Sequence, residues 1–245
     1  MKTKTLHGVA LLASTAFALP LLAVPAKPAA KPAAKTAKPA AKPAAKPAGP
    51  AAGMAVAAFK IPLPSYLGTP KQIKDTTAPP FQKRGPVYLP KGATNLAAGK
   101  KATSSDDAPI IGELTLITNG EKGAEEGQWV ELGPGTQWVQ IDLGKAATIS
   151  GVLFWHYHGE SRVYRDVVVQ LADDPDFVTN VRTVYNNDQD NSSGLGAGKD
   201  REFYEAAQGQ WIPIAGLKAR YVRFYSRGNT SDPQNQYIEA EVWGK

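Results

Sequence analysis

The sequence contains no cysteine among its 245 residues and only three histidines. The absence of cysteine excludes disulfides, thiol nucleophiles and thiolate metal sites. A phosphate-binding loop, a nucleophile elbow, a zinc-protease helix and a dinucleotide fingerprint are also missing. The adjacent carboxylates Asp173 and Asp174 lie in an apparent turn, whereas a glycosidase holds two carboxylates across a cleft. We therefore expect that the protein is not an enzyme.

Positive charge is scarce in the part of the chain that can build a core. The formal net charge is +6, but six lysines lie in residues 27–46, which contain no acid. Residues 95–245 contain 14 Lys and Arg against 21 Asp and Glu, a net charge of −7. Because binding to phosphate backbones depends on clustered positive charge, we expect no nucleic-acid partner.

The N-terminal residues have the layout of a secretory signal peptide. A short basic segment, Met1–Lys4, precedes an apolar stretch from Val9 to Val24, and small residues follow near Ala26. We assign residues 1–26 to this leader and expect export to the periplasm, the cell surface or the medium. The alternative is an uncleaved anchor, because the apolar stretch approaches the ~20 residues that span a bilayer. A retained leader would be the protein's only contact with a membrane.

Two proline-rich segments follow the leader. Residues 27–53 repeat Lys-Pro-Ala-Ala, which forbids a stable helix and a core, so we expect a disordered, extended linker. It acts either as a spacer or, in the alternative, as a row of lysines that touches an anionic polymer. Residues 54–94 mix proline with larger apolar residues. We expect this strap to pack onto the next domain or onto a partner through Phe59, Tyr66, Phe81 and Tyr88.

Apolar residues recur at every second position in parts of residues 95–245. Val139, Ile141 and Leu143 alternate with Gln140 and Asp142, which predicts a strand with one face in the core. No helical pattern competes, and turn-rich pieces separate short strands, so the domain is predicted to be an antiparallel β-sandwich or barrel. The further predicted strands are 149–156, 167–171, 181–185, 211–214, 221–225 and 238–243.

Seven motifs in this region, taken in order, resemble a known family. They are the opening Asn95–Ser105, the turn Thr118–Gly120, the core stretch Gln137–Gly144, Ile149–Val152, Val169–Phe177, Ala219–Ser226 and Ile238–Gly244. Together they resemble the discoidin family, also called coagulation factor 5/8 type C. The resemblance implies a galactose-binding-like jelly roll similar to family 32 carbohydrate-binding modules. It implies further that a ligand is bound by loops at one end of the sandwich.

The loop after residue 154 is rich in groups that suit sugars. Aromatic faces stack on the C–H face of a pyranose, while His, Glu and Arg hydrogen-bond to hydroxyls. The alternative is that Trp155 and Tyr157 belong to the core and only the loop tip is exposed. The candidate sugar-binding residues are Trp155, His156, Tyr157, His158, Glu160, Arg162 and, from a second loop, Trp129.

We expect non-catalytic binding of a glycan or a cell-surface polysaccharide. The rival hypothesis is a protein-interaction or assembly module of a cell-envelope complex, with the strap or the loops docking the partner. An exposed Trp155, Tyr157 or Trp129 in a shallow groove would favour a sugar. Burial of all three, with an apolar patch around residues 59–88, would favour a protein.

Two metal hypotheses arise in the same region. His156, His158 and Glu160 alternate, so on a strand they would share one face and could ligate zinc or iron. The resemblance implies instead a structural calcium site, with Asn119 and Glu239 at the matching positions and backbone carbonyls as further ligands. The family prefers Asp where Asn119 stands, and a hydroxyl residue where this chain has Ala124.

Overall fold

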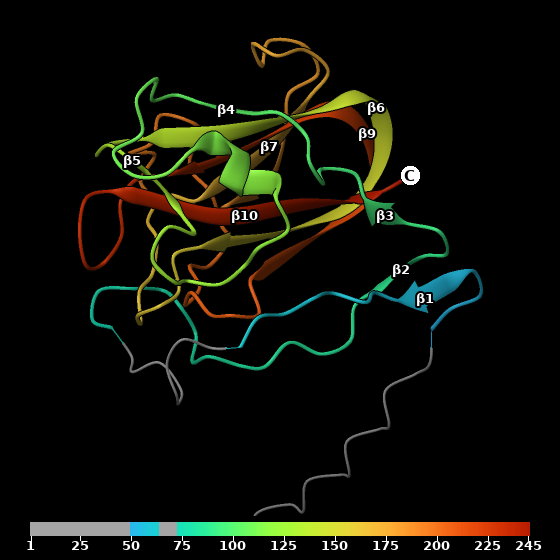
Figure 1. The fold of residues 1–245 in the computed structure, drawn as a ribbon, viewed down its shortest axis with the longest axis horizontal. Coiled ribbons are helices and arrows are strands. Elements are labelled where there is room, and N and C mark those ends of the chain that lie inside the picture. The colour runs from blue at the N-terminus through green and yellow to red at the C-terminus, as the bar shows by residue number, and fades with distance from the viewer. Residues whose placement is uncertain (1–49, 64–72) are drawn as a thin grey trace, which may run out of the picture. The chain divides into compact units, whose positions relative to one another are not determined.

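The computed structural model describes residues 50–63 and 73–245. Tyr66, the leader and most of the linker lie outside the described residues. The described residues form ten strands and one 3₁₀ helix, and all the paired strands run antiparallel (Figure 1). The predicted all-β antiparallel sandwich is confirmed. Among the described residues, no helix has the length and hydropathy that a membrane crossing requires.

The elements follow one another along the chain as β1 (Met54–Val56), β2 (Tyr88–Pro90), β3 (Thr94–Asn95), β4 (Ala102–Ser104), η1 (Leu114–Thr118), β5 (Val130–Leu132), β6 (Gln137–His156), β7 (Val168–Ala172), β8 (Arg182–Asn186), β9 (Gln210–Ser226) and β10 (Asn235–Gly244). The strands β1 and β2 pair only with each other, and the remaining strands form one continuous sheet. Its order is β3-β10-β6-β9-β7-β8, with β4 added to β6 and β5 added to β10.

Two long, curved strands turn this sheet into a sandwich. The first part of β6 pairs with β4 and with the end of β9, which also pairs with β7. The last part of β6 pairs with β10 and with the start of β9. Between these parts the register shifts after Asp142, and Gly144 has φ +84°, where a glycine is favoured. Both strands thus bend and pass through both layers (Figure 1).

The sequence pattern predicted separate strands where the structure has these continuous ones. Residues 138–144 and 149–156 join in β6, and 211–214 and 221–225 join in β9. The prediction of four separate strands was wrong at the bends. The connecting residues 144–146 are exposed and do not alternate. They belong to β6 only as an irregular stretch between the paired residues Asp142 and Ala147.

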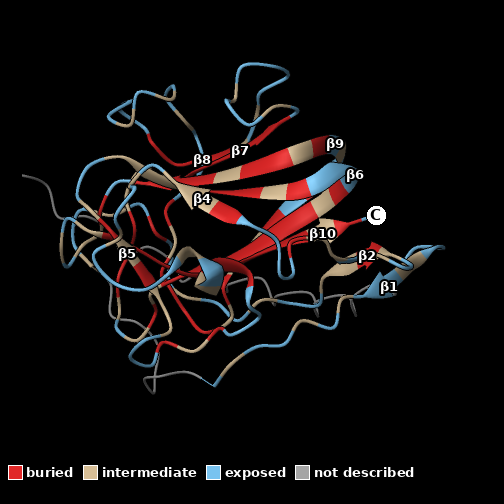
Figure 2. Ribbon diagram, turned by 45° about the horizontal axis from the view of Figure 1, so that its top comes forward, coloured by how far each residue is buried: buried red, intermediate tan, exposed pale blue. Residues whose placement is uncertain are grey.

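The core lies between the two layers. Val139, Ile141 and Leu143 are buried as the alternation predicts, and the rings of Phe154 and Phe224 meet across the interior at 5.2 Å. In Figure 2 the buried residues run along the long strands, while the loops are mostly exposed. Burying one such side chain stabilises the fold by about 1.5–3 kcal/mol, so this core is the main source of stability.

The strap packs on the outer face of the layer formed by β10, the last part of β6 and the start of β9. The ring of Phe59 lies 5.4 Å from Trp211 and 5.2 Å from Trp243. The guanidinium of Arg84 donates to the backbone oxygens of Gln208 and Gly209 at 2.7 and 3.0 Å. The described part of the strap therefore covers a sheet face that would otherwise meet water.

Candidate functional site

Three strand ends meet at one end of the sandwich. The start of β10 pairs with β5 through Asn235 and Leu132, and with the end of β6 through Tyr237 and His156. The loops that leave these strands therefore gather at this edge. They enclose a shallow cleft of about 170 Å³, lined by Trp129, Glu131, Tyr157, Arg162, Asp232 and Gln236. We call this the end cleft.

Two aromatic side chains supply the apolar surface of the end cleft. Trp129 precedes β5, and Tyr157 follows β6 directly. Their rings meet edge to face with centroids 5.0 Å apart, and both residues are half-buried. The Nε1–H of Trp129 is shielded from solvent and has no hydrogen-bond partner among the residues that the structure describes. A buried donor without a partner costs about 1–3 kcal/mol, so this N–H is a local cost to the stability of the fold.

Arg162 supplies a fixed positive charge. Its residue is only 7% exposed, and its guanidinium lies 4.7 Å above the ring of Tyr157. It donates to Glu160 at 3.0 Å and to Asp232 at 3.2 Å. A further hydrogen bond of 3.3 Å reaches Gln236. Because several partners hold the side chain, its position does not depend on a ligand.

Gln236 links the polar groups of the end cleft into a network. Its side-chain nitrogen donates to Glu131 at 3.1 Å and to Asp232 at 3.2 Å. Its side-chain oxygen accepts from the hydroxyl of Tyr164 and from the amide of Asn229. The carboxylates of the cleft are therefore held as acceptors at fixed places, which favours recognition of hydroxyl or amino groups.

Three of the predicted sugar-binding residues lie in the interior. Trp155, His156 and His158 are each 0% exposed. Trp155 donates its indole N–H to the backbone oxygen of Ala207 at 2.9 Å. The Nδ1 atom of His156 lies 2.8 Å from a carboxylate oxygen of Glu205. The prediction that these three residues contact the ligand is corrected by their burial.

The reason for this burial is the position of β6 in the sheet. Its last part lies between β9 and β10, with one face toward the core and the other toward a second apolar cluster. This cluster contains Leu153 and Trp155, and Phe59 of the strap packs against it. Both faces of the strand are covered, so alternate residues on either side are buried.

The other predicted residues reach the end cleft or its rim. Tyr157, Arg162 and Trp129 line it, whereas Glu160 is exposed beside Arg162 with 64% of its side chain accessible. The sequence did not single out Glu131, Asp232 or Gln236. Asp232 lies in the loop before β10 and Gln236 near the start of β10. The many hydrogen-bonding side chains of residues 227–237 were the available signal.

The zinc or iron hypothesis does not agree with the geometry. His156 is engaged by Glu205, and Nε2 of His158 lies 2.9 Å from the backbone oxygen of Lys122. Glu160 is paired with Arg162. Within the described residues, the one group of three His or carboxylate side chains compact enough for a metal ion is a different one, Asp166, Asp188 and Asp190.

The two positions implied for calcium lie at the loop after η1 and on β10. The side-chain oxygen of Asn119 accepts from the backbone N–H of Glu121 at 2.7 Å. Glu239 is buried, and one of its oxygens accepts from the N–H of Gly120 at 3.1 Å. Burial raises the pKa of Glu239 to about 8.

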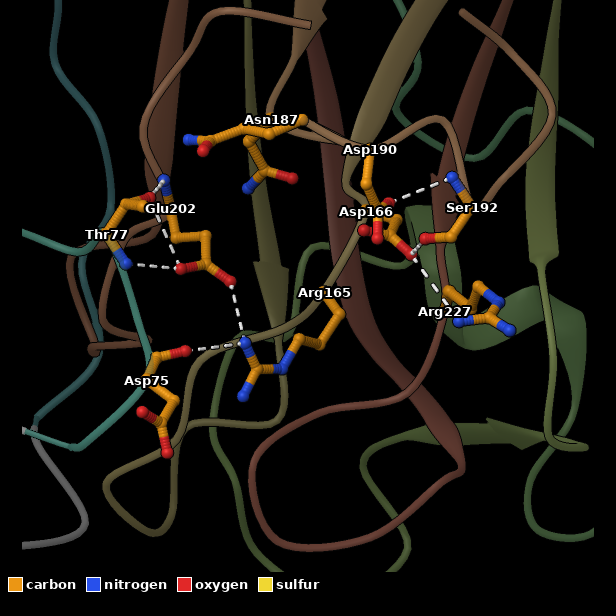
Figure 3. A pocket seen from close by; sticks show the side chains of 10 residues that line it. Asp75, Thr77, Arg165, Asp166, Asn187, Asp190, Ser192, Glu202 and Arg227 are labelled. Atoms are coloured by element: carbon orange, nitrogen blue, oxygen red, sulfur yellow. Dashed lines mark hydrogen bonds and ion pairs between the residues drawn. The ribbon is translucent and has the colours of Figure 1, made fainter. Parts of the chain in front are cut away.

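A larger polar pocket of about 540 Å³ lies where the strap meets the sandwich (Figure 3). In it, Arg165 donates to the backbone oxygen of Asp75 and to the carboxylate of Glu202. Ser192 donates to Asp166 at 2.6 Å, and burial raises the pKa of that carboxyl. Because Arg165 pairs with Glu202 and also binds the strap at Asp75, we interpret the pocket as a polar seam that holds the strap.

No protein-family model matches the sequence, and no curated protein matches it. Solved structures do resemble its fold. The chitosan-binding module 1 of a chitosanase/glucanase from Paenibacillus sp. IK-5 is 24% identical, with a TM-score of 0.44 over 62% of this chain and 99% of that module. A fucose-binding module of Streptococcus pneumoniae is 16% identical, with a TM-score of 0.43 over 62% and 98%.

A family 32 module of C. perfringens in complex with galactose is 9% identical, with a TM-score of 0.44 over 62% of this chain and 98% of that module. All three TM-scores are below 0.5, so we base the function on the geometry of the end cleft. These structures are carbohydrate-binding modules, the class of galactose-binding-like domain that the sequence motifs resemble.

Proposed function

We propose that the protein is an exported, non-catalytic glycan-binding module whose ligand lies in the end cleft. One observation carries this proposal. Two half-exposed aromatic rings, Trp129 and Tyr157, stand beside a fixed network of charged and amide groups centred on Arg162. An apolar wall next to fixed donors and acceptors is the arrangement that a sugar ring requires.

The size of the cleft limits the ligand. Its volume of about 170 Å³ is below the roughly 300 Å³ at which pockets for drug-sized ligands begin. We therefore expect the cleft to hold one sugar unit, either alone or at the end of a chain. The ring would stack on Tyr157 or Trp129, while Glu131 and Asp232 accept hydrogen bonds from its hydroxyls.

The test is titration calorimetry after a glycan array has identified a ligand. Replacing the ring in Tyr157→Ala removes a stacking contact, and we expect the Kd to rise about tenfold or more. The matched control is Tyr88→Ala, which removes a half-buried tyrosine from β2 outside the cleft and should leave the Kd unchanged. Failure of the folded protein to bind any glycan would refute the proposal, and release of a shortened glycan would refute its non-catalytic part.

The alternative function is a protein-interaction module. Its supporting observation is a mainly apolar groove of about 610 Å³ between the strap and β9, lined among others by Pro86, Tyr88, Trp211 and Ile214. Under this alternative, Tyr88→Ala should weaken capture of an envelope protein and Tyr157→Ala should not. The same two variants therefore separate the two functions, each serving as the control for the other.

Export is part of the proposal and rests on the leader. A basic start followed by an apolar stretch and small residues is typical of a cleaved signal peptide. Mass spectrometry of the protein recovered from cell fractions would check this. An N-terminus near Ala26 in the exported fraction is expected, and intact Met1 in a membrane fraction would support the uncleaved anchor instead.

A further inference from the structure

The loop after η1 is joined to β10 by a buried lysine. The side chains of Lys122 and Glu241 are only 5% and 7% exposed, and the ammonium lies 3.0 Å from a Glu241 oxygen. The same ammonium donates to the backbone oxygen of Gly120 at 2.8 Å and lies 5.4 Å from the ring of Trp155. A charge in such a place requires both a countercharge and hydrogen-bond acceptors, and the structure provides them.

Most of the oxygen atoms that a calcium ion would use here already accept a hydrogen bond. Among the backbone oxygens, that of Gly120 accepts from Lys122, and that of Lys122 is bound by His158. Asn119 turns its side-chain oxygen to its own loop. Among the oxygens of these groups, only Oε1 of Glu239 has no hydrogen-bond partner in the described part of the chain. Since calcium takes six to eight oxygen ligands, these residues do not fit the ion that the family resemblance implies.

We propose that the ammonium of Lys122 acts as a built-in cation that replaces a structural calcium ion and fixes the loop 118–123 to β10. The charges around it agree with this role. Glu241 is oriented by the indole N–H of Trp243 at 2.8 Å and faces the ammonium, so these two groups neutralise each other. The protein therefore folds fully in the absence of calcium.

The position of the loop gives this lysine a wider role. The chain runs from Lys122 through Ala124, which is buried in the second apolar cluster, to Trp129 at the wall of the end cleft. Lys122 also holds His158 in place through its backbone oxygen. The cation thus supports both chain segments that flank the cleft without occupying it.

The first test is thermal unfolding in excess EDTA and in excess calcium. The measurement uses the Asp190→Asn variant beside the wild type. Asp190 belongs to the separate acidic group with Asp166 and Asp188, and its replacement removes the contribution of ion binding there. We expect equal midpoints in the two buffers. An ion at a hundredfold excess over its Kd would raise the midpoint by roughly 5–10 °C, and such a rise in the Asp190→Asn variant would overturn the proposal.

The second test removes the charge and keeps the apolar stem. Lys122→Met leaves Glu241 buried without a countercharge, and we expect the unfolding midpoint to fall by about 10 °C. Lys145→Met, at an exposed lysine of β6, should not change it. The double variant Lys122→Met/Glu241→Gln should recover part of the loss, because it removes the unpaired charge. An unchanged midpoint in Lys122→Met would overturn the proposal, and if this variant does not fold, the calcium comparison still decides it.

Discussion

Trp155→Phe separates a structural role for this tryptophan from a role in ligand binding. From the sequence, Trp155 is a candidate for stacking on a sugar. In the structure it is 0% exposed, and its indole N–H is bound to the backbone oxygen of Ala207 at 2.9 Å. The phenyl ring keeps most of the apolar contacts but removes the hydrogen bond. The variant should therefore lose stability and keep its affinity.

The magnitude follows from two contributions. Leaving the buried oxygen of Ala207 without a donor costs about 1–3 kcal/mol. The smaller ring leaves a cavity beside Leu153 and Ile238, its neighbours in the second apolar cluster, which costs about 1 kcal/mol more. A total of about 2–4 kcal/mol corresponds to a fall in the unfolding midpoint of roughly 5–15 °C for a domain of this size.

The assay combines thermal unfolding with calorimetric titration of the glycan well below the midpoint. We expect a lower midpoint and a Kd within about twofold of the wild type, which corresponds to less than 0.5 kcal/mol. Tyr157→Ala is the reciprocal control, because it should weaken binding at a smaller cost in stability. A Trp155→Phe protein with a normal midpoint and a Kd raised tenfold would refute the burial argument.

Three other predictions follow from the structure. Glu131→Gln should weaken binding of neutral or amino sugars and improve binding of uronates in a competition assay, because it lowers the negative charge of the end cleft. Gly209→Ala should lower the unfolding midpoint by roughly 5–10 °C, since φ is +65° and a Cβ would lie 2.5 Å from the ring of Trp155. The hydrogen bond from Arg220 lowers the pKa of the carboxyl of Asp142. The folded-state pKa is therefore below the unfolded value of 3.8. The stability that the Asp142–Arg220 pair contributes is thus fully present above pH 3.8 and is lost as the pH falls through the folded-state pKa. Because the pair is partly exposed, Asp142→Asn should reduce the free energy of unfolding at neutral pH by less than about 1 kcal/mol. Denaturant unfolding at a series of pH values should also show a weaker loss of stability in acid for this variant.

The fold could be predicted from local pattern because its core strands alternate. Val139, Ile141 and Leu143 point into the interior in the order that the two-residue period requires. The continuity of β6 could not be predicted in this way. Residues 144–146 are exposed and carry no alternation, and they belong to the strand only because β6 and β9 pair again at Ala147, after the bend.

The site could be predicted only in part, because the sequence does not distinguish an aromatic residue of the core from one on a binding surface. Trp155 and Tyr157 are two residues apart, yet one is covered and the other lines the end cleft. The difference lies in groups far away in the sequence, namely Ala207, which accepts the indole hydrogen bond, and Phe59, which packs on the same cluster. Glu131 carried no local signal at all, since an acid on a short strand is most often simply exposed.

The same coverage supports the walls of the end cleft. Phe59 of the strap packs against the cluster that contains Leu153 and Trp155 of β6, and Lys122 anchors the adjoining loop to β10. With these supports in place, Tyr157 follows the buried last part of β6, and Arg162 is bound by three partners before any ligand arrives. A site preorganised in this way loses little conformational entropy on binding. If the end cleft binds one sugar unit as we propose, this rigidity contributes to the affinity beside the small contact area.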